Sequence, residues 1–235
     1  DFDLIFFLHD DWGGKTREQV FLALARQLRQ VNPKSKALAL EVPVCLTTSP
    51  MVRRKRFSSW LTSSGSPKQV DQNAFLFRPW LFLTPVLAPL IPPIAAANRI
   101  VLKRNLCSIM NKLDFQSTGL MLWVTDPYHR GFADLFPEAL LIYNVVDKYE
   151  EHPVNVKSWW RRARVSNDDR YILRRANFIF ATSPALQEEA KMVNPRSYWV
   201  PNGVEIETFQ TTYDEMRKPH ELQELNGTII GFEGK

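Results

Sequence analysis

The chain has few of the residues that build metal centres and disulfide frameworks. Its 235 residues include only 2 cysteines and 4 histidines. Cys45 and Cys107 stand far apart, without the C-x-x-C spacing of a zinc or redox site. This pattern favours two free thiols over a disulfide. No group of histidines and cysteines has the spacing of zinc ligands either, so the sequence gives no indication of a metal centre.

Long apolar runs are also absent, apart from the uncharged segment at residues 80–97, WLFLTPVLAPLIPPIAAA. A membrane-spanning helix needs about 20 apolar residues, and the prolines at positions 85, 89, 92 and 93 would break such a helix. We expect the segment to be a buried crossover, because exposed apolar patches of this size are uncommon. The alternative is an apolar lip that faces a lipid-like ligand or dips into a membrane.

Positive charge exceeds negative charge. The 30 Lys and Arg residues against 25 Asp and Glu residues give a formal net charge of +5, which favours an anionic partner such as a nucleotide, a phosphorylated substrate, nucleic acid or an acidic membrane. Two segments, RRKRFSSW (53–60) and WWRRAR (159–164), mix basic and aromatic residues as single-strand binders do. A solvated loop and a helix with one exposed face give the same pattern, so we expect no nucleic-acid partner.

Short apolar runs alternate with helical patterns along the chain. Within TREQVFLALARQLRQVNP (16–33), for example, apolar residues recur every three or four positions until Pro33. Uninterrupted apolar strands that alternate with amphipathic helices predict an α/β fold with a Rossmann-like, doubly wound parallel sheet. The predicted strands are residues 3–8, 36–42, 120–125, 140–146, 177–182, 197–200 and 227–232.

Polar side chains follow several of the predicted strands. In doubly wound sheets, ligands bind beyond the carboxyl ends of the strands. Asp147 lies at such an end, within LIYNVVDKYEEH (141–152), and Gly13 and Gly14 separate the first strand from the first helix. Glycines there let backbone N–H groups approach an anion at the helix N-terminus, although a plain turn is the alternative. The other polar residues at strand ends are His9, Asp10, Asp11, Asp126 and Ser183.

The most specific motif lies near the end of the chain. The segment NFIFATSPALQEEA (177–190) is followed by VPNGV (200–204) and Phe209. An Asn-Gly pair after proline predicts a tight turn on physical grounds alone. Together, however, these segments resemble the end of the N-terminal domain in GT-B glycosyltransferases of family 4.

Three further segments resemble the same family: DWGGKTREQVFLALARQL (11–28), LMLWVTDPYH (120–129) and LIYNVVDKYEEH. Asn144 and Glu205 depart from the pattern, since Asp is usual at both places. The resemblance implies that residues 1–203 form an N-terminal, acceptor-side Rossmann-like domain. Residues 204–235 would then be a linker and the truncated start of a C-terminal, donor-binding domain, so that this chain alone would be inactive.

The activity that the resemblance implies is retaining transfer of a sugar, as by a hexosyltransferase. The donor would be a nucleotide-diphosphate sugar (UDP- or GDP-sugar), and the acceptor a glycan or lipid-linked molecule in polysaccharide biosynthesis. No cofactor or metal would be needed, and no Asp-x-Asp motif of the metal-dependent kind is flanked by strand signals. The protein would be cytoplasmic, with a peripheral contact on the inner face of the membrane. A non-catalytic nucleotide- or anion-binding Rossmann-like module is the alternative.

Asp147 is the predicted catalytic residue, because it occupies the place where related enzymes carry a His or Asp that faces the transferred sugar. A carboxylate there could stabilise the positive charge that develops as the glycosidic bond breaks. Its alternative roles are a helix N-cap or an ion pair with Lys148 or Arg161. The residues predicted to bind donor or acceptor are His9, Trp12, Gly13, Gly14, Tyr128, His129 and Asn202.

Overall fold

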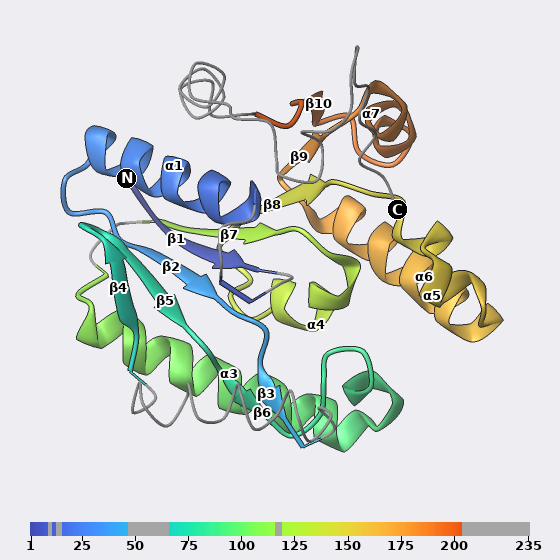
Figure 1. Cartoon of the computed structure of the whole chain (residues 1–235), viewed down its shortest axis with the longest axis horizontal. Helices are drawn as coiled ribbons and strands as arrows, with labels where there is room; N and C mark the ends of the chain where they lie inside the picture. Colours follow the sequence, from blue (N-terminus) through green and yellow to red (C-terminus); the bar gives the residue numbers. More distant parts are fainter. Residues whose placement is uncertain (9–10, 13–15, 47–65, 116–118, 204–235) are drawn as a thin grey trace, which may run out of the picture. The chain divides into compact units, whose positions relative to one another are not determined.

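The computed structural model describes residues 1–8, 11–12, 16–46, 66–115 and 119–203 (Figure 1). The chain divides into two units, Asp1–Pro201 and Asn202–Lys235. The first unit carries the fold; of the second, only Asn202 and Gly203 are described, and both are exposed. The predicted domain boundary after residue 203 stays a prediction, as does the strand at 227–232. The basic segment 53–56 also lies outside the described residues.

An 8-stranded sheet runs through the first unit in the order β10-β9-β8-β7-β1-β2-β5-β4. Its strands pair in parallel, except that β4 is antiparallel to β5. The strands are β1 (Phe2–Phe7), β2 (Ala37–Leu40), β4 (Lys68–Asp71), β5 (Ala74–Phe77), β7 (Gly119–Val124), β8 (Leu140–Val145), β9 (Phe178–Ala181) and β10 (Ser197–Trp199). The prediction of a Rossmann-like, doubly wound parallel sheet is confirmed, and the antiparallel edge strand β4 is an addition to it.

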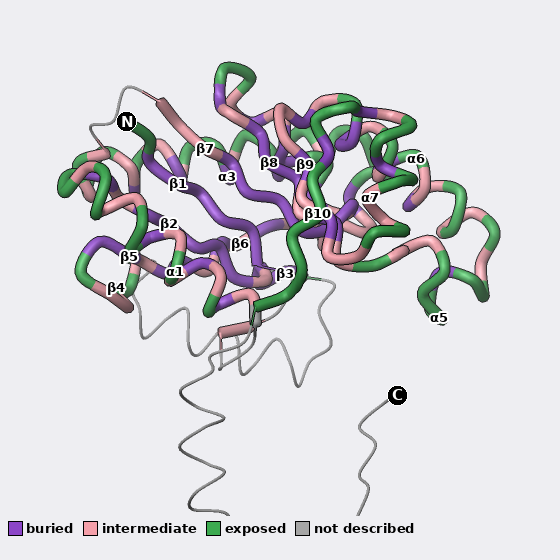
Figure 2. The backbone as a smooth tube through the Cα atoms, turned by 90° about the horizontal axis from the view of Figure 1, so that it is seen from above, coloured by how far each residue is buried: buried purple, intermediate pink, exposed green. Residues whose placement is uncertain are grey.

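Helices cover both faces of this sheet. The apolar side chains of β1 alternate between the two faces, as the pleat requires. Leu4 and Phe6 pack with α1 (Thr16–Val31) on one face, and Ile5 and Phe7 pack with α3 (Pro92–Lys112) on the other. Figure 1 shows α1 and α3 on opposite sides of the sheet, and Figure 2 shows the central strands as the buried part of the chain.

The remaining elements are shorter or lie toward the β10 end of the sheet. Buried residues of α4, α6 and α7 join the same apolar core as α3. A separate pair of short parallel strands, β3 and β6, precedes α3. The elements are β3 (Val44–Cys45), β6 (Trp80–Leu81), η1 (Ala88–Leu90), η2 (Pro127–His129), α4 (Arg130–Ala133), η3 (Tyr149–Glu151), α5 (Pro153–Val156), α6 (Trp159–Arg175) and α7 (Pro184–Lys191).

The segment at residues 80–97 differs from the prediction. Leu81 and Ala88 are buried as expected, but residues 89–93 are exposed, so the predicted burial is wrong for this part. Prolines are tolerated in the first turn of a helix, and α3 begins at Pro92. The preceding turn therefore forms an uncovered corner. Among the described helices, none has the length and apolar composition needed to cross a membrane.

Candidate functional site

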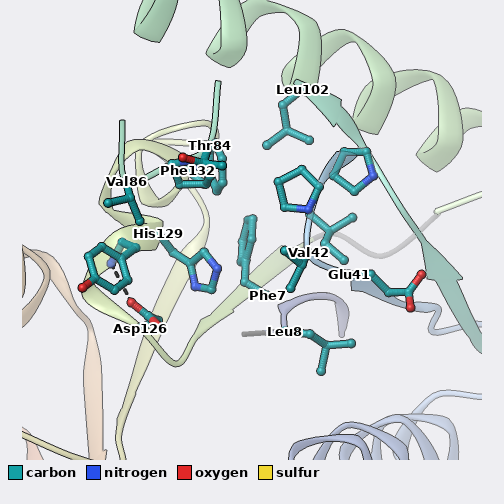
Figure 3. Close-up of a pocket in the computed structure, with 15 residues that line it drawn as sticks. Phe7, Leu8, Glu41, Val42, Thr84, Val86, Leu102, Asp126, His129 and Phe132 are labelled. Atoms are coloured by element: carbon teal, nitrogen blue, oxygen red, sulfur yellow. Dashed lines mark hydrogen bonds between the residues drawn. The ribbon is translucent and has the colours of Figure 1, made fainter. Parts of the chain in front are cut away.

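A pocket of about 190 Å³ lies where the chain reverses its direction across the sheet. β1 has β2 on one side and β7 on the other, so the carboxyl ends of β1 and β7 form the topological switch point at which doubly wound folds bind ligands. Phe7 and Leu8 from the end of β1, Glu41 and Val42 after β2, and Asp126 after β7 line this pocket. We call it the switch-point pocket (Figure 3).

One wall of the switch-point pocket is aromatic and carries an acid and a histidine. The ring centroids of Phe7 and His129 are 5.5 Å apart, and Phe7 also stacks on Phe132 at 5.8 Å. Asp126 is fully buried beside them, and its Oδ1 accepts a hydrogen bond of 2.7 Å from the backbone N–H of Tyr128. Glu41 lies on the opposite side of the pocket (Figure 3). The Glu41 carboxylate itself points away from this wall (Figure 3), so Asp126 supplies the carboxylate on the aromatic side.

Glu41 is held by a buried arginine that the sequence did not reveal. Arg78, at the end of β5, donates to Glu41 Oε1 at 2.7 Å and to Oε2 at 3.1 Å, and it also donates to Asp11 Oδ1 at 2.8 Å. The side chains of Arg78 and Glu41 are only 10% and 9% exposed. The backbone N–H of Trp12 donates to Glu41 as well. This network ties the chain after β1 to the ends of β2 and β5.

A second network joins the loops that follow β7 and β8. The Tyr149 hydroxyl accepts from Arg17 at 3.0 Å and donates to the carbonyl oxygen of Thr125 at 2.9 Å. Asn155, which is 2% exposed, donates to the Tyr149 carbonyl oxygen and accepts from the Tyr128 hydroxyl. Burial, reinforced by the nearby Asp126 carboxylate, raises the pKa of Tyr149, so its hydroxyl stays a neutral donor.

The predicted catalytic residue, Asp147, lies in the loop after β8 but lines a different pocket. This α6 pocket of about 490 Å³ lies between the loop and helices α6 and α7. Asp147 is exposed, and its Oδ1 accepts from the backbone N–H of Lys148 at 2.8 Å. The Lys148 ammonium pairs instead with Glu189 at 2.9 Å and with Glu151 at 3.3 Å. Among the residues that the structure describes, Asp147 is therefore neither a helix N-cap nor an ion-pair partner of Lys148 or Arg161.

A half-buried acid, Asp169, also lines the α6 pocket. The hydroxyl of Tyr143, on β8, donates to Asp169 Oδ1, on α6, at 2.5 Å. The pKa of Asp169 is raised to about 6, chiefly by burial; the hydrogen bond from Tyr143 opposes this rise, and the carboxylates of Glu150 and Glu189 add to it. The lining of the pocket therefore includes one carboxyl group with a raised pKa.

A third pocket, of about 310 Å³, adjoins the switch-point pocket and carries three arginines. Arg164 donates to the carbonyl oxygens of Pro85 and Val86 and lies 3.4 Å from Asp168, which also pairs with Arg130 at 2.7 Å. Arg99 is exposed. Pro85, Tyr128 and Phe132 line both pockets. We call this the arginine pocket. Asp134 and Asp168 also line it, and Asp168 engages Arg130 and Arg164, so the exposed Arg99 is the guanidinium group that suits an anion such as phosphate.

The structure brings together only part of the predicted site. Tyr128 and His129 line the switch-point pocket, and Trp12 is tied to its Glu41. Asp147 lies in the α6 pocket, and Asn202 belongs to the second unit. His9, Gly13 and Gly14 lie outside the described residues.

Sequence reasoning missed five residues that hold the site together: Glu41, Arg78, Arg17, Tyr149 and Asn155. A signal existed for Glu41 and Tyr149, since both closely follow apolar strands. No described group of three or more His, Cys, Asp or Glu residues has the arrangement of a metal site.

Comparisons with known proteins find similar solved structures at low sequence identity. No protein-family model and no curated protein matches the chain. A solved structure named trehalose-6-phosphate from E. coli, bound with UDP-2-fluoro glucose, is 11% identical with a TM-score of 0.49, over 94% of this chain and 53% of that one. An α,α-trehalose 6-phosphate synthase from Burkholderia multivorans is 11% identical with a TM-score of 0.47, over 94% and 54%. The chain thus spans about half the length of these structures. Likeness at this level carries no argument about activity or substrate.

Proposed function

We propose that the chain is the N-terminal, acceptor-side half of a GT-B glycosyltransferase of the family 4 kind. One observation carries the proposal. The segments that resemble this family, 11–28, 120–129 and 141–152, are far apart in sequence, yet they meet at one edge of the sheet through the hydrogen bonds of Tyr149 with Arg17 and Thr125. This edge is where doubly wound folds bind their ligands.

The two adjoining pockets favour an acceptor that has both apolar and anionic parts. The switch-point pocket offers Phe7, Leu102 and Phe132 to an apolar group, and its Asp126 carboxylate could accept hydrogen bonds from sugar hydroxyls. The arginine pocket next to it offers the exposed guanidinium group of Arg99 to a phosphate. A lipid-linked phosphate or diphosphate acceptor combines these features, and a plain glycan would use only the first pocket.

Asp147 is the proposed catalytic residue on the donor side. Its side chain is exposed at the rim of the α6 pocket, so a nucleotide sugar held by a second, donor-binding domain could reach it. A carboxylate close to the anomeric carbon stabilises the positive charge of an oxocarbenium-like transition state. Retention of configuration, independence of metals and a cytoplasmic location belong to the same proposal and stay predictions.

The direct test is turnover of nucleotide sugars by the full-length protein. A panel of UDP-, GDP- and TDP-sugars is incubated with the protein, and release of nucleoside diphosphate is measured with and without lipid-linked and water-soluble acceptors. A transferase uses one donor class and accelerates when its acceptor is present. Tight binding of a nucleotide without release from any donor would instead favour the non-catalytic binding module.

Addition of a chelator tests whether donor turnover depends on a metal ion. Addition of EDTA should leave the rate of donor turnover unchanged if the reaction is independent of metal ions. A rate that falls with EDTA and returns with Mg²⁺ or Mn²⁺ would contradict this part of the proposal.

A further inference from the structure

The corner that precedes α3 exposes large apolar side chains. Residues 89–93, Pro-Leu-Ile-Pro-Pro, are all exposed, with Leu90 at 55% and Ile91 at 44%; we call them the apolar tip. Exposed apolar residues that stand singly need no explanation, but five in a row form a contiguous patch of the kind that marks an interaction site. The four prolines of the region keep the tip rigid, because each fixes its own φ angle.

The apolar surface continues along one side of α3. Pro93, Ala96 and Ile100 are spaced by three and four residues, so they lie on one face of the helix. All three are exposed, and Ile100 is 54% exposed. Lys103 and Arg104 are exposed on the next turn of the same face. Lys103 lies 5.9 Å from the ring centroid of Phe136, which holds it beside the helix.

Charge on this surface has one sign. From residue 79 to residue 113 the chain has no Asp or Glu, whereas it has Arg99, Lys103, Arg104 and Lys112. Two acids on neighbouring elements are already engaged, since Asp168 pairs with Arg130 and Arg164 and Asp134 accepts from Tyr171, whereas Glu138 is exposed. A rigid apolar tip beside exposed basic side chains matches the headgroup region of a membrane that contains acidic lipids.

We propose that the apolar tip and the exposed face of α3 dock on an anionic lipid bilayer. Leu90 and Ile91 enter the interface between headgroups and acyl chains, and Lys103 and Arg104 contact lipid phosphates while their stems lie along the apolar surface. The arginine pocket is partly lined by Ala88, Pro89 and Arg99, so it opens beside the tip. If the proposed function holds, an acceptor anchored in the bilayer would reach this pocket without leaving the membrane.

The test is binding of the protein to lipid vesicles, measured by co-sedimentation. Vesicles of phosphatidylcholine alone are compared with vesicles in which about a third of the lipid is phosphatidylserine. We expect binding to the anionic vesicles that weakens as salt is raised. Lys103→Gln with Arg104→Gln should lower the affinity by roughly fivefold for each charge removed, and Leu90→Gln with Ile91→Gln should lower it by about tenfold or more.

Matched substitutions elsewhere provide the controls. Lys34→Gln with Lys68→Gln removes the same charge from exposed positions outside α3, and Val31→Gln with Met192→Gln places the same polar group at residues that are 79% and 82% exposed. Both control pairs should bind vesicles like the parent. Because all the substituted side chains are exposed, no pair should change the thermal unfolding temperature by more than a degree or two.

Three results would overturn the proposal. The first is no binding to anionic vesicles, and the second is binding that the tip and α3 variants do not weaken more than the controls. The third is a dimer in solution that the Leu90→Gln, Ile91→Gln pair dissociates, which would assign the tip to self-association. The vesicle assay needs no sugar donor, so it tests membrane docking independently of the transferase proposal. A protein that binds vesicles but turns over no nucleotide sugar contradicts only the transferase proposal.

Discussion

The Arg17 guanidinium donates a hydrogen bond to the Tyr149 hydroxyl at 3.0 Å, although the two residues are 132 positions apart. The same hydroxyl donates to the carbonyl oxygen of Thr125. One phenol therefore joins the first turn of α1, the end of β7 and the loop after β8. Asp147 lies two residues before Tyr149, so this contact fixes the backbone that presents the proposed catalytic carboxylate.

Replacement of Tyr149 by Phe tests whether that connection matters for the reaction. The substitution keeps the ring but removes both hydrogen bonds, so we expect a loss of about 1–2 kcal/mol in the free energy of unfolding. We also expect kcat to fall by about tenfold because Asp147 is held less firmly. Tyr171→Phe, which removes a hydrogen bond of 2.8 Å to Asp134, is the control. Equal effects of both variants on kcat would contradict the positioning role.

Loss of Arg78 should be among the most destabilising single changes in the described chain. Arg78→Leu leaves the buried Glu41 carboxylate without its bidentate partner, and removing one partner of a buried pair costs about 3–5 kcal/mol. The control is Arg26→Leu, since Arg26 pairs with Asp71 at 2.9 Å but is 61% exposed, and such surface pairs contribute about 0–1 kcal/mol. Urea unfolding of both variants checks the difference; similar midpoints would contradict it.

Asp169 should make stability fall as the pH rises from about 4 to about 6. The pKa of this carboxyl is raised from 3.8 to about 6 in the folded chain, so over this range the folded state keeps a proton that the unfolded state has lost. The contribution of Asp169 to stability is then highest below pH 4 and declines until Asp169 ionises in the folded state. At about 1.4 kcal/mol per pKa unit, the contribution is on the order of 2–3 kcal/mol.

Asp169→Asn isolates this contribution from the other titrating groups. Asn cannot ionise, yet its carbonyl oxygen can still accept the hydrogen bond from Tyr143. The difference in free energy of unfolding between the parent and the variant, measured by urea unfolding from pH 4 to pH 7, should change by on the order of 2–3 kcal/mol across this range. A difference that is independent of pH would show that Asp169 ionises normally in the folded protein.

Arg99→Gln tests the assignment of the arginine pocket to the acceptor. We expect the KM for an acceptor that carries phosphate to rise by about tenfold, because one charge-assisted contact is lost. The kcat and the KM for the nucleotide sugar should stay unchanged. Arg162→Gln, at an exposed position of α6, removes the same charge and should leave all three constants as they are. An equal rise in KM for a neutral acceptor would contradict a phosphate contact at Arg99.

The alternation of apolar strands and helical patterns was enough to predict the layered fold. Apolar runs such as Leu140–Val145 predict the strands β1, β2, β7, β8 and β9. Every residue in such a run can be buried between two helical layers. The short strands β4 and β5 were missed because AFLF (74–77) is only four residues long and is flanked by polar turns.

The candidate site was less predictable because it depends on pairings between distant residues. The sequence placed Tyr128 and His129 at a strand end, and the structure puts them in the switch-point pocket. It could not show that Arg78 reaches Glu41, 37 residues earlier, since no local pattern encodes such a contact. The exposure of the apolar tip was missed for a related reason: composition alone does not say whether another layer covers a segment.

The most direct test of the account is the effect of Asp147→Ala on turnover by the full-length protein with the donor that the panel identifies. The side chain is exposed and bonded only to the backbone of its neighbour among the described residues, so the variant should fold as stably as the parent. Glu151→Ala, which removes a nearby exposed carboxylate, is the control. The account predicts a loss in kcat of about 10²-fold or more for Asp147→Ala and almost none for Glu151→Ala. A variant that turns over donor as fast as the parent would contradict it.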